Sequence, residues 1–127
     1  MLKEAAGPLF RTLLPRGNLL PYERLYAHAP VESVFGAVAR SLGVLATTME
    51  RYDDAERHFA VAMEVEQAMR ARPWLAHAQH DLATMVLARG GDGDSERARI
   101  LLDEAATTYR ELGMNAWAAR ALAATQR

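Results

Sequence analysis

Residues 51–62 read RYDDAERHFAVA. Within this stretch Ala55, Phe59 and Ala62 recur three or four positions apart, which places them on one side of an α-helix. Asp53 precedes them at a position where a side-chain oxygen caps a helix, and acidic residues there favour the positive end of the helix. We therefore predict a helix capped by Asp53, with a small–large–small stripe facing a neighbouring helix.

The chain repeats this pattern. A shift of 43 residues places similar side chains over one another: Ala55 over Ala98, Phe59 over Leu102, Ala62 over Ala105 and Trp74 over Trp117. Upstream, a shift of 40 places Leu42 over Leu82 and Gly43 over Ala83. The difference between the two shifts falls in the glycine- and aspartate-rich run at 90–94, where a surface turn tolerates an insertion. The sequence thus predicts two stacked helical hairpins.

The periodicity predicts an all-α fold of about five main helices. Hairpin 1 covers 31–70, with a first helix from Val31 to Met49 and ion pairs Asp53–Arg57 and Glu66–Arg70 along the second. Hairpin 2 covers 73–112, with Pro73 in the first turn of one helix and Ser95 capping the next. Gly113 is predicted in the left-handed conformation, and Asn115 caps a final helix at 115–124. Residues 31–127 form the repeat domain. Residues 1–30 hold four of the five prolines and are predicted as an irregular lead-in with short helices near 9–14 and 21–28.

Composition narrows the possible functions. The chain has 127 residues, a formal net charge of −1 and no cysteine, so a disulfide framework, a thiolate metal site and a cysteine nucleophile are excluded. A net charge of −1 gives no sign of the clustered basic face that nucleic-acid binding requires. The chain shows neither an apolar run of about 18 residues nor a signal peptide. We expect a cytoplasmic protein with no membrane or nucleic-acid partner.

The repeated positions resemble the tetratricopeptide motif. The first unit supplies Leu42, Gly43, Tyr52, Ala55, Phe59 and Ala62, and the second supplies Leu82, Ala83, Ala98, Leu102 and Ala105. Ser95 stands where the aromatic Tyr52 would recur. The units are longer than the usual 34 or so residues, and in this they resemble the C-terminal regions of large bacterial signalling ATPases, including LuxR-type transcriptional regulators and ATPase-linked cyclases. The resemblance implies a scaffold accessory to signalling or transcriptional regulation.

The resemblance does not extend to activity, because the chain has no phosphate-binding loop with its lysine. His77 and His80 share a helix face. A metal site needs three or four ligands, and the sequence shows no second cluster of ligating residues that must lie next to these two histidines. Asp53 and its neighbours are explained by helix capping, and Ser41 and Ser95 lack a neighbouring base. We therefore predict no enzymatic activity, no metal and no cofactor.

In such a stack the first helices of successive units line a concave face. The predicted partner-binding residues are Ala37, Arg40, Val44, Thr47, His77, His80, Thr84 and Leu87. Arg40 and the two histidines could hold an acidic group of a peptide from another protein; the alternative is a solvated or dimer-buried face. We expect a homodimer, because a short stack leaves an apolar end face uncovered.

Two other functions remain open at the level of sequence. One is a small-ligand sensor, with Met49, Met63, Met85 and Trp74 lining an apolar pocket between the hairpins. The other is a detached regulator tail that only folds and dimerises. Methionines at helical spacing are more often core residues than ligand contacts, and paired tryptophans more often pack between repeats.

Overall fold

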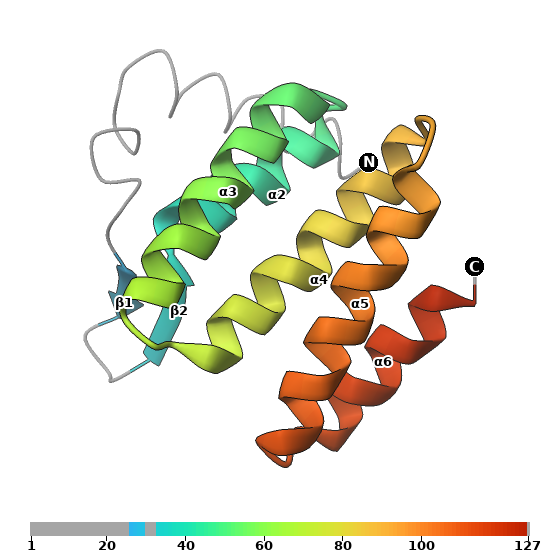
Figure 1. Ribbon diagram of the computed structural model, residues 1–127. Coiled ribbons are helices and arrows are strands. Elements are labelled where there is room, and N and C mark those ends of the chain that lie inside the picture. Colours follow the sequence, from blue (N-terminus) through green and yellow to red (C-terminus); the bar gives the residue numbers. More distant parts are fainter. Residues whose placement is uncertain (1–25, 30–32, 127) are drawn as a thin grey trace, which may run out of the picture.

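The computed structural model describes residues 26–29 and 33–126. Its elements follow the chain in this order: β1 (Tyr26–Ala29), β2 (Ser33–Ala37), α2 (Val38–Thr48), α3 (Tyr52–Ala68), α4 (Arg72–Arg89), α5 (Asp94–Glu111) and α6 (Asn115–Thr125). The five helices of the described part confirm the helical fold. Figure 1 shows them side by side in chain order, from α2 and α3 to α6 at the opposite edge. The short helix expected near 9–14 lies outside the described residues.

A small antiparallel hairpin precedes the helices and corrects two predictions. β1 pairs with β2 in a register that sets Tyr26 opposite Ala37 and Ala29 opposite Ser33. The first helix of hairpin 1 consequently begins at Val38, not Val31, and the helix expected near 21–28 gives way to a strand over its last residues. The apolar spacing in 31–38 fits a helix, but its β-branched and aromatic residues favour a strand, and a nearby proline and glycine disfavour a helix.

The helices pack in consecutive antiparallel pairs. α2 contacts α3, α3 contacts α4, α4 contacts α5 and α5 contacts α6, and α2 also touches α4. The predicted motif positions other than Tyr52 are all buried: Leu42, Gly43, Ala55, Phe59, Ala62, Leu82, Ala83, Ala98, Leu102 and Ala105. Alanine and glycine let the helix axes approach, and the large side chains fill the space between them. Sequence periodicity therefore identified the core.

Three of the helices end in the same way. The backbone N–H groups of Arg51, Ala71 and Met114 each donate to the carbonyl five residues earlier, at 2.9, 2.9 and 2.8 Å. The residue before each donor is left-handed: Glu50 (φ 60°), Arg70 (φ 56°) and Gly113 (φ 75°). This arrangement satisfies carbonyls that a helix end would otherwise leave unpaired. It confirms the prediction for Gly113 and places the breaks where the sequence expected them.

The helix starts differ from the prediction. α3 begins at Tyr52, α5 at Asp94 and α6 at Asn115, so Asp53, Ser95 and Asn115 are not N-caps. Each lies inside its helix, because the turn before it closes with backbone hydrogen bonds and leaves no extended residue at the cap position. The acidic residues Asp53 and Asp94 still lie in first turns, where negative charge is favourable.

The expected ion pairs along α3 also change. Arg57 pairs with Asp54 instead of Asp53, because residues three apart are neighbours on the same helix face as well as residues four apart. Glu66 does not pair with Arg70: its side chain is fully buried and accepts a backbone hydrogen bond. The inward position of Glu66 becomes important for the site.

Candidate functional site

The face shared by α2 and α4 is joined by a charged pair. Arg40 of α2 donates through Nε to Oδ2 of Asp81 on α4, at 2.7 Å, and about a quarter of each side chain is exposed. Burial raises the pKa of the Asp81 carboxyl, and the Arg40 guanidinium opposes that rise. Arg40 was predicted to bind a partner's acidic group. Its charge is already shared with Asp81, so a partner would meet a pair of hydrogen-bonding groups in place of a lone cation.

Next to this pair lies a small hollow between the two helices. Its lining includes Val44 and Thr47 from α2 and Thr84 from α4, with Asp81 at its edge, and its volume is about 170 Å³. Val44 is 41 % exposed and Leu87, one turn beyond Thr84 on α4, is 36 % exposed. The structure thus brings together three predicted residues from two repeats, Val44, Thr47 and Thr84. Leu87 instead lines a separate hollow with residues of α5 and α6, among them Leu102 and Ala124. Ala37, by contrast, is buried.

His77 does not lie on this surface, which corrects its predicted role. The side chain is buried and its Nδ1 lies 2.7 Å from the hydroxyl of Tyr109 on α5. The rings of Trp74 and Trp117 flank it, with centroids 5.4 and 4.5 Å away. Burial, with Arg40 adding to the effect, lowers the pKa of His77 to about 4. A neutral imidazole held by a tyrosine hydroxyl is a packing element, and both tryptophans pack around it as predicted.

His80 is intermediate between core and surface. Its Nε2 is buried and has no hydrogen-bond partner among the residues that the structure describes, and its Nδ1 lies 4.0 Å from Oδ1 of Asp81. Burial lowers its pKa, although Asp81 works in the opposite direction. The imidazole is therefore largely neutral at physiological pH, so it cannot supply the positive charge that the sequence suggested for binding an acidic group.

The most unusual group of this region is Glu66, whose role the sequence analysis missed. The side chain is fully buried on α3. Its Oε1 accepts a hydrogen bond from the backbone N–H of Ala37 at 3.4 Å, and its Oε2 has no hydrogen-bond partner in the described part of the chain. Burial raises the pKa of Glu66 to about 7. The available signal was its register, since Glu66 follows Phe59 and Ala62 along the inward stripe.

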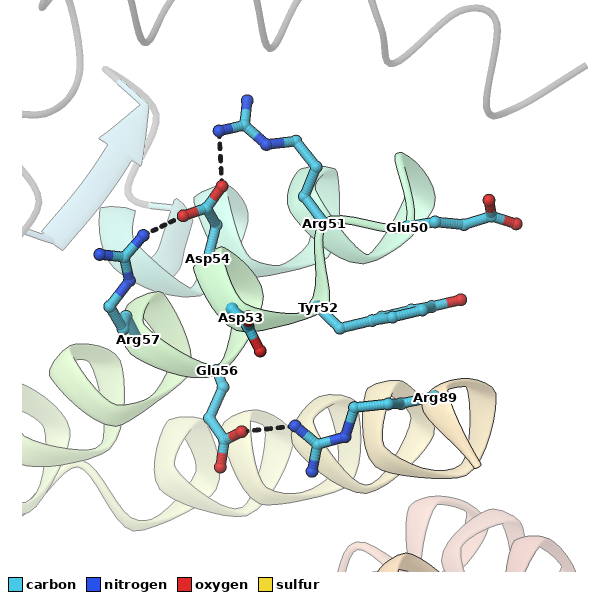
Figure 2. Close-up of a pocket in the computed structure, with 8 residues that line it drawn as sticks. All are labelled: Glu50, Arg51, Tyr52, Asp53, Asp54, Glu56, Arg57 and Arg89. Atoms are coloured by element: carbon cyan, nitrogen blue, oxygen red, sulfur yellow. Dashed lines mark hydrogen bonds and ion pairs between the residues drawn. The ribbon is translucent and has the colours of Figure 1, made fainter. Parts of the chain in front are cut away.

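A second, wider hollow of about 840 Å³ opens beside the turn between α2 and α3. Figure 2 shows five of its charged residues in pairs: Arg51 and Arg57 with Asp54, and Glu56 with Arg89. Arg89 also holds both carboxylate oxygens of Asp94, each at 2.9 Å.

The pairs around Arg89 link three helices. Glu56 lies on α3, Arg89 on α4 and Asp94 on α5, and Arg97 of α5 adds a further contact to Glu56 at 2.5 Å. Because these opposite charges pair across helices, the network joins the first hairpin to the second. It does not present an unsatisfied group to a ligand.

The methionines proposed for a ligand pocket belong to the core. Met85 is fully buried, and Met49 and Met63 pack against the same cluster. No group of three or more metal-ligating side chains converges within residues 26–29 and 33–126. Over the same residues, every helix is too short or too polar to cross a bilayer.

Comparison of the chain with family models, with curated proteins and with solved structures yields no match in any of the three. The resemblance to tetratricopeptide repeats therefore rests on the residues of this chain alone. The remaining guide to function is the surface that the helices form, above all the face of α2 and α4.

Proposed function

We propose that the chain is a non-catalytic scaffold, built as a short stack of tetratricopeptide-like hairpins, that binds a segment of another protein along the face of α2 and α4. The scaffold assignment is supported by the burial of the repeated alanines and by the close approach of Gly43 to Phe59. Helical stacks of this kind gather binding residues from successive repeats onto one surface.

One observation carries the proposal. Val44 is an exposed apolar side chain at a hollow that Thr47 and Thr84 also line, and the hollow reaches Asp81 of the polar Arg40–Asp81 pair. An apolar anchor surrounded by hydrogen-bonding groups is the usual composition of a peptide-binding surface. The binding segment would bury an apolar side chain over Val44 and use backbone groups to reach Thr47, Thr84 and Asp81.

Site-specific photo-crosslinking in cells tests this placement. A photoreactive phenylalanine analogue is introduced at Val44 or at Thr84, both exposed, and the matched control carries it at Ala60, which is exposed on α3. The proposal expects one protein to be captured from both groove positions and not from the control. Capture from Ala60 alone, or of unrelated proteins from the two groove positions, would contradict it.

The resemblance to signalling ATPases suggests where such a partner belongs. We infer an accessory role in bacterial signalling or transcriptional regulation, and mass spectrometry of the crosslinked protein tests it. A captured histidine kinase, signalling ATPase or transcription factor would support the inference. A metabolic enzyme captured at both groove positions would leave the groove in place and remove the regulatory role.

A further inference from the structure

α6 occupies the position of a first helix, and no element of the described residues occupies the position of its second helix. With the 43-residue shift, Ala78 of α4 corresponds to Ala121 of α6, and both are fully buried. Ala78 packs in the same cluster as residues of α3, and Ala121 packs in the cluster that contains α5. α6 therefore lies on α5 as α4 lies on α3, which is the order seen in Figure 1.

The face of α4 that points away from α3 is covered by α5. The corresponding face of α6, which points away from α5, is not covered by any described helix. Ala76 of α4 is fully buried in the cluster shared with α5, and Gln79 donates to Glu104 of α5 at 3.0 Å. Their counterparts on α6, Ala119 and Leu122, are both exposed. Within the described residues, the face of α6 that corresponds to the α5-binding face of α4 has no helix on it.

Charge indicates what kind of helix fits there. The first helices are slightly basic: α2 and α6 each hold one arginine and no carboxylate, and α4 holds two arginines and one aspartate. The second helices are acidic: α3 holds five carboxylates and one arginine, and α5 holds five carboxylates and three arginines. α4 thus packs between two acidic second helices, α3 and α5. α6 packs against only one acidic second helix of the described residues, α5.

Arg120 of α6 is the residue that could bind a carboxylate of an additional helix. It corresponds to His77, the residue that meets Tyr109 of the covering helix α5. Arg120 is exposed, stacks 4.6 Å from the centre of the Trp117 ring and has no carboxylate partner among residues 26–29 and 33–126. A helix placed on α6 as α5 is placed on α4 would bring its Tyr109-equivalent position to this guanidinium.

We propose that the outer face of α6 is a docking surface for an acidic amphipathic helix of a partner protein, seated as α5 is seated on α4, with a carboxylate directed at Arg120. A second copy of this chain is the weaker candidate. Its acidic helices already use their apolar faces in its own core, and its free α6 would bring a second arginine towards the first.

A designed peptide tests the surface directly. The probe is a fluorescent α5 peptide, residues 93–113, stapled between the outward positions 96 and 100 so that it is helical in solution. Two versions carry Tyr109→Glu or Tyr109→Lys, and binding to the full chain is followed by fluorescence anisotropy. The glutamate peptide should bind about tenfold more tightly, and Arg120→Glu in the protein should reverse that preference.

A matched pair of protein variants locates the binding site. Ala119→Glu places a charge on the proposed face and should abolish peptide binding, whereas Ala60→Glu makes the same change on an exposed position of α3 and should leave it unchanged. Binding that survives Ala119→Glu would show that the peptide replaces α5 within the core, and would overturn the proposal. So would the absence of binding of either peptide at concentrations near millimolar.

Sedimentation velocity distinguishes the other occupant. A partner helix on α6 takes the place of the homodimer expected from the sequence, so the chain alone should sediment as a monomer at micromolar concentration, with the same coefficient for Ala119→Glu. A dimer that dissociates on Ala119→Glu would assign the face to a second copy and contradict the heterologous partner. Neither outcome depends on the α2–α4 groove, so failure here leaves the proposed function to its own test.

Discussion

Gly43 lies directly against the ring of Phe59. A Cβ built on Gly43 would stand 2.7 Å from Cε1 of Phe59, well inside van der Waals contact. Phe59 is fully buried in the core cluster that also holds Ala55 and Leu82. This contact sets how closely α2 approaches α3, because only a glycine leaves room for the ring.

We expect Gly43→Ala to destabilise the protein by about 1–3 kcal/mol. Alanine normally stabilises a helix interior relative to glycine by about 1 kcal/mol, so a loss measured by urea unfolding would report the clash with Phe59. The double variant Gly43→Ala/Phe59→Leu should recover part of the loss, since leucine occupies less of that space. Additive losses in the double variant would mean that the two residues do not interact.

Arg70 holds a left-handed conformation that costs a side-chain-bearing residue about 1 kcal/mol relative to glycine. Arg70→Gly should therefore stabilise the protein by about 0.5–1 kcal/mol, visible as a higher thermal midpoint. Gly113→Ala, at the same kind of helix end, serves as the opposite control and should destabilise by a similar amount. A destabilised Arg70→Gly variant would show that the arginine side chain stabilises more than its backbone strain costs.

Glu66 should make stability fall as the pH rises. Its folded pKa of about 7 lies above the ordinary value of 4.5, so the folded chain keeps a proton that the unfolded chain has released. The stabilisation from this proton is complete below pH 4.5 and is lost as the pH rises through 7. Glu66→Gln keeps the oxygen that accepts from Ala37 and should gain about 2–3 kcal/mol relative to wild type between pH 5 and pH 8.

Asp94→Asn is the control for that measurement. The hydrogen bonds from Arg89 lower the pKa of Asp94 to about 2, so its contribution is present above the ordinary value of 3.8 and lost only as the pH falls through 2. Between pH 5 and pH 8 the deficit of Asp94→Asn should be constant. A Glu66→Gln profile as flat as this one would contradict the buried neutral carboxyl.

His77 changes stability in the opposite direction. Its folded pKa of about 4 lies below the ordinary value of 6.5, so its contribution is complete above pH 6.5 and is lost as the pH falls towards 4. Between pH 4.5 and 6.5 the effects of His77 and Glu66 oppose each other in the wild-type protein. NMR of labelled histidine at pH 5 should show a neutral His77 imidazole, and a protonated ring would refute the assignment.

The hydroxyl of Tyr109 satisfies His77, so Tyr109→Phe should cost about 1–3 kcal/mol by leaving the buried Nδ1 unpaired. Tyr52→Phe is the matched control. Tyr52 is half-buried, and its hydroxyl makes no hydrogen bond to residues 26–29 or 33–126, so its removal should change the unfolding free energy little. Equal losses in both variants would indicate a general effect of removing a tyrosine hydroxyl.

Arg89 joins Asp94 and Glu56 through a planar guanidinium. Arg89→Lys keeps the charge but loses the paired geometry, and we expect a loss of about 1 kcal/mol. Arg99→Lys is the comparison. Within residues 26–29 and 33–126, Arg99 pairs only with Glu96 and Asp103 of its own helix, so this variant should lose less stability. The loss of unfolding free energy in both variants should be smaller in 1 M salt, because salt screens exposed ion pairs.

The sequence alone determined where the helices lie and which of their faces are buried. The alanine and leucine periodicity marked Ala55, Phe59, Ala98 and Leu102 as core, because helix periodicity and burial leave a local record in the chain. Gly113 was predictable for the same reason, since a left-handed helix end depends on one residue. The start of α2 was not, because residues 33–37 fit both a helix and a strand and only the pairing with β1 decided between them.

The tertiary structure decided the state of the polar groups. The helix register turns Glu66 inward, but the hydrogen-bond partners of the two buried side chains come from distant segments: Ala37 of β2 donates to Glu66, and Tyr109 of α5 meets His77. The same holds for Arg40, whose charge is shared with an aspartate on another repeat, and for the uncovered face of α6. Pairing, desolvation and coverage arise between distant segments, and a one-dimensional pattern does not specify which segments meet.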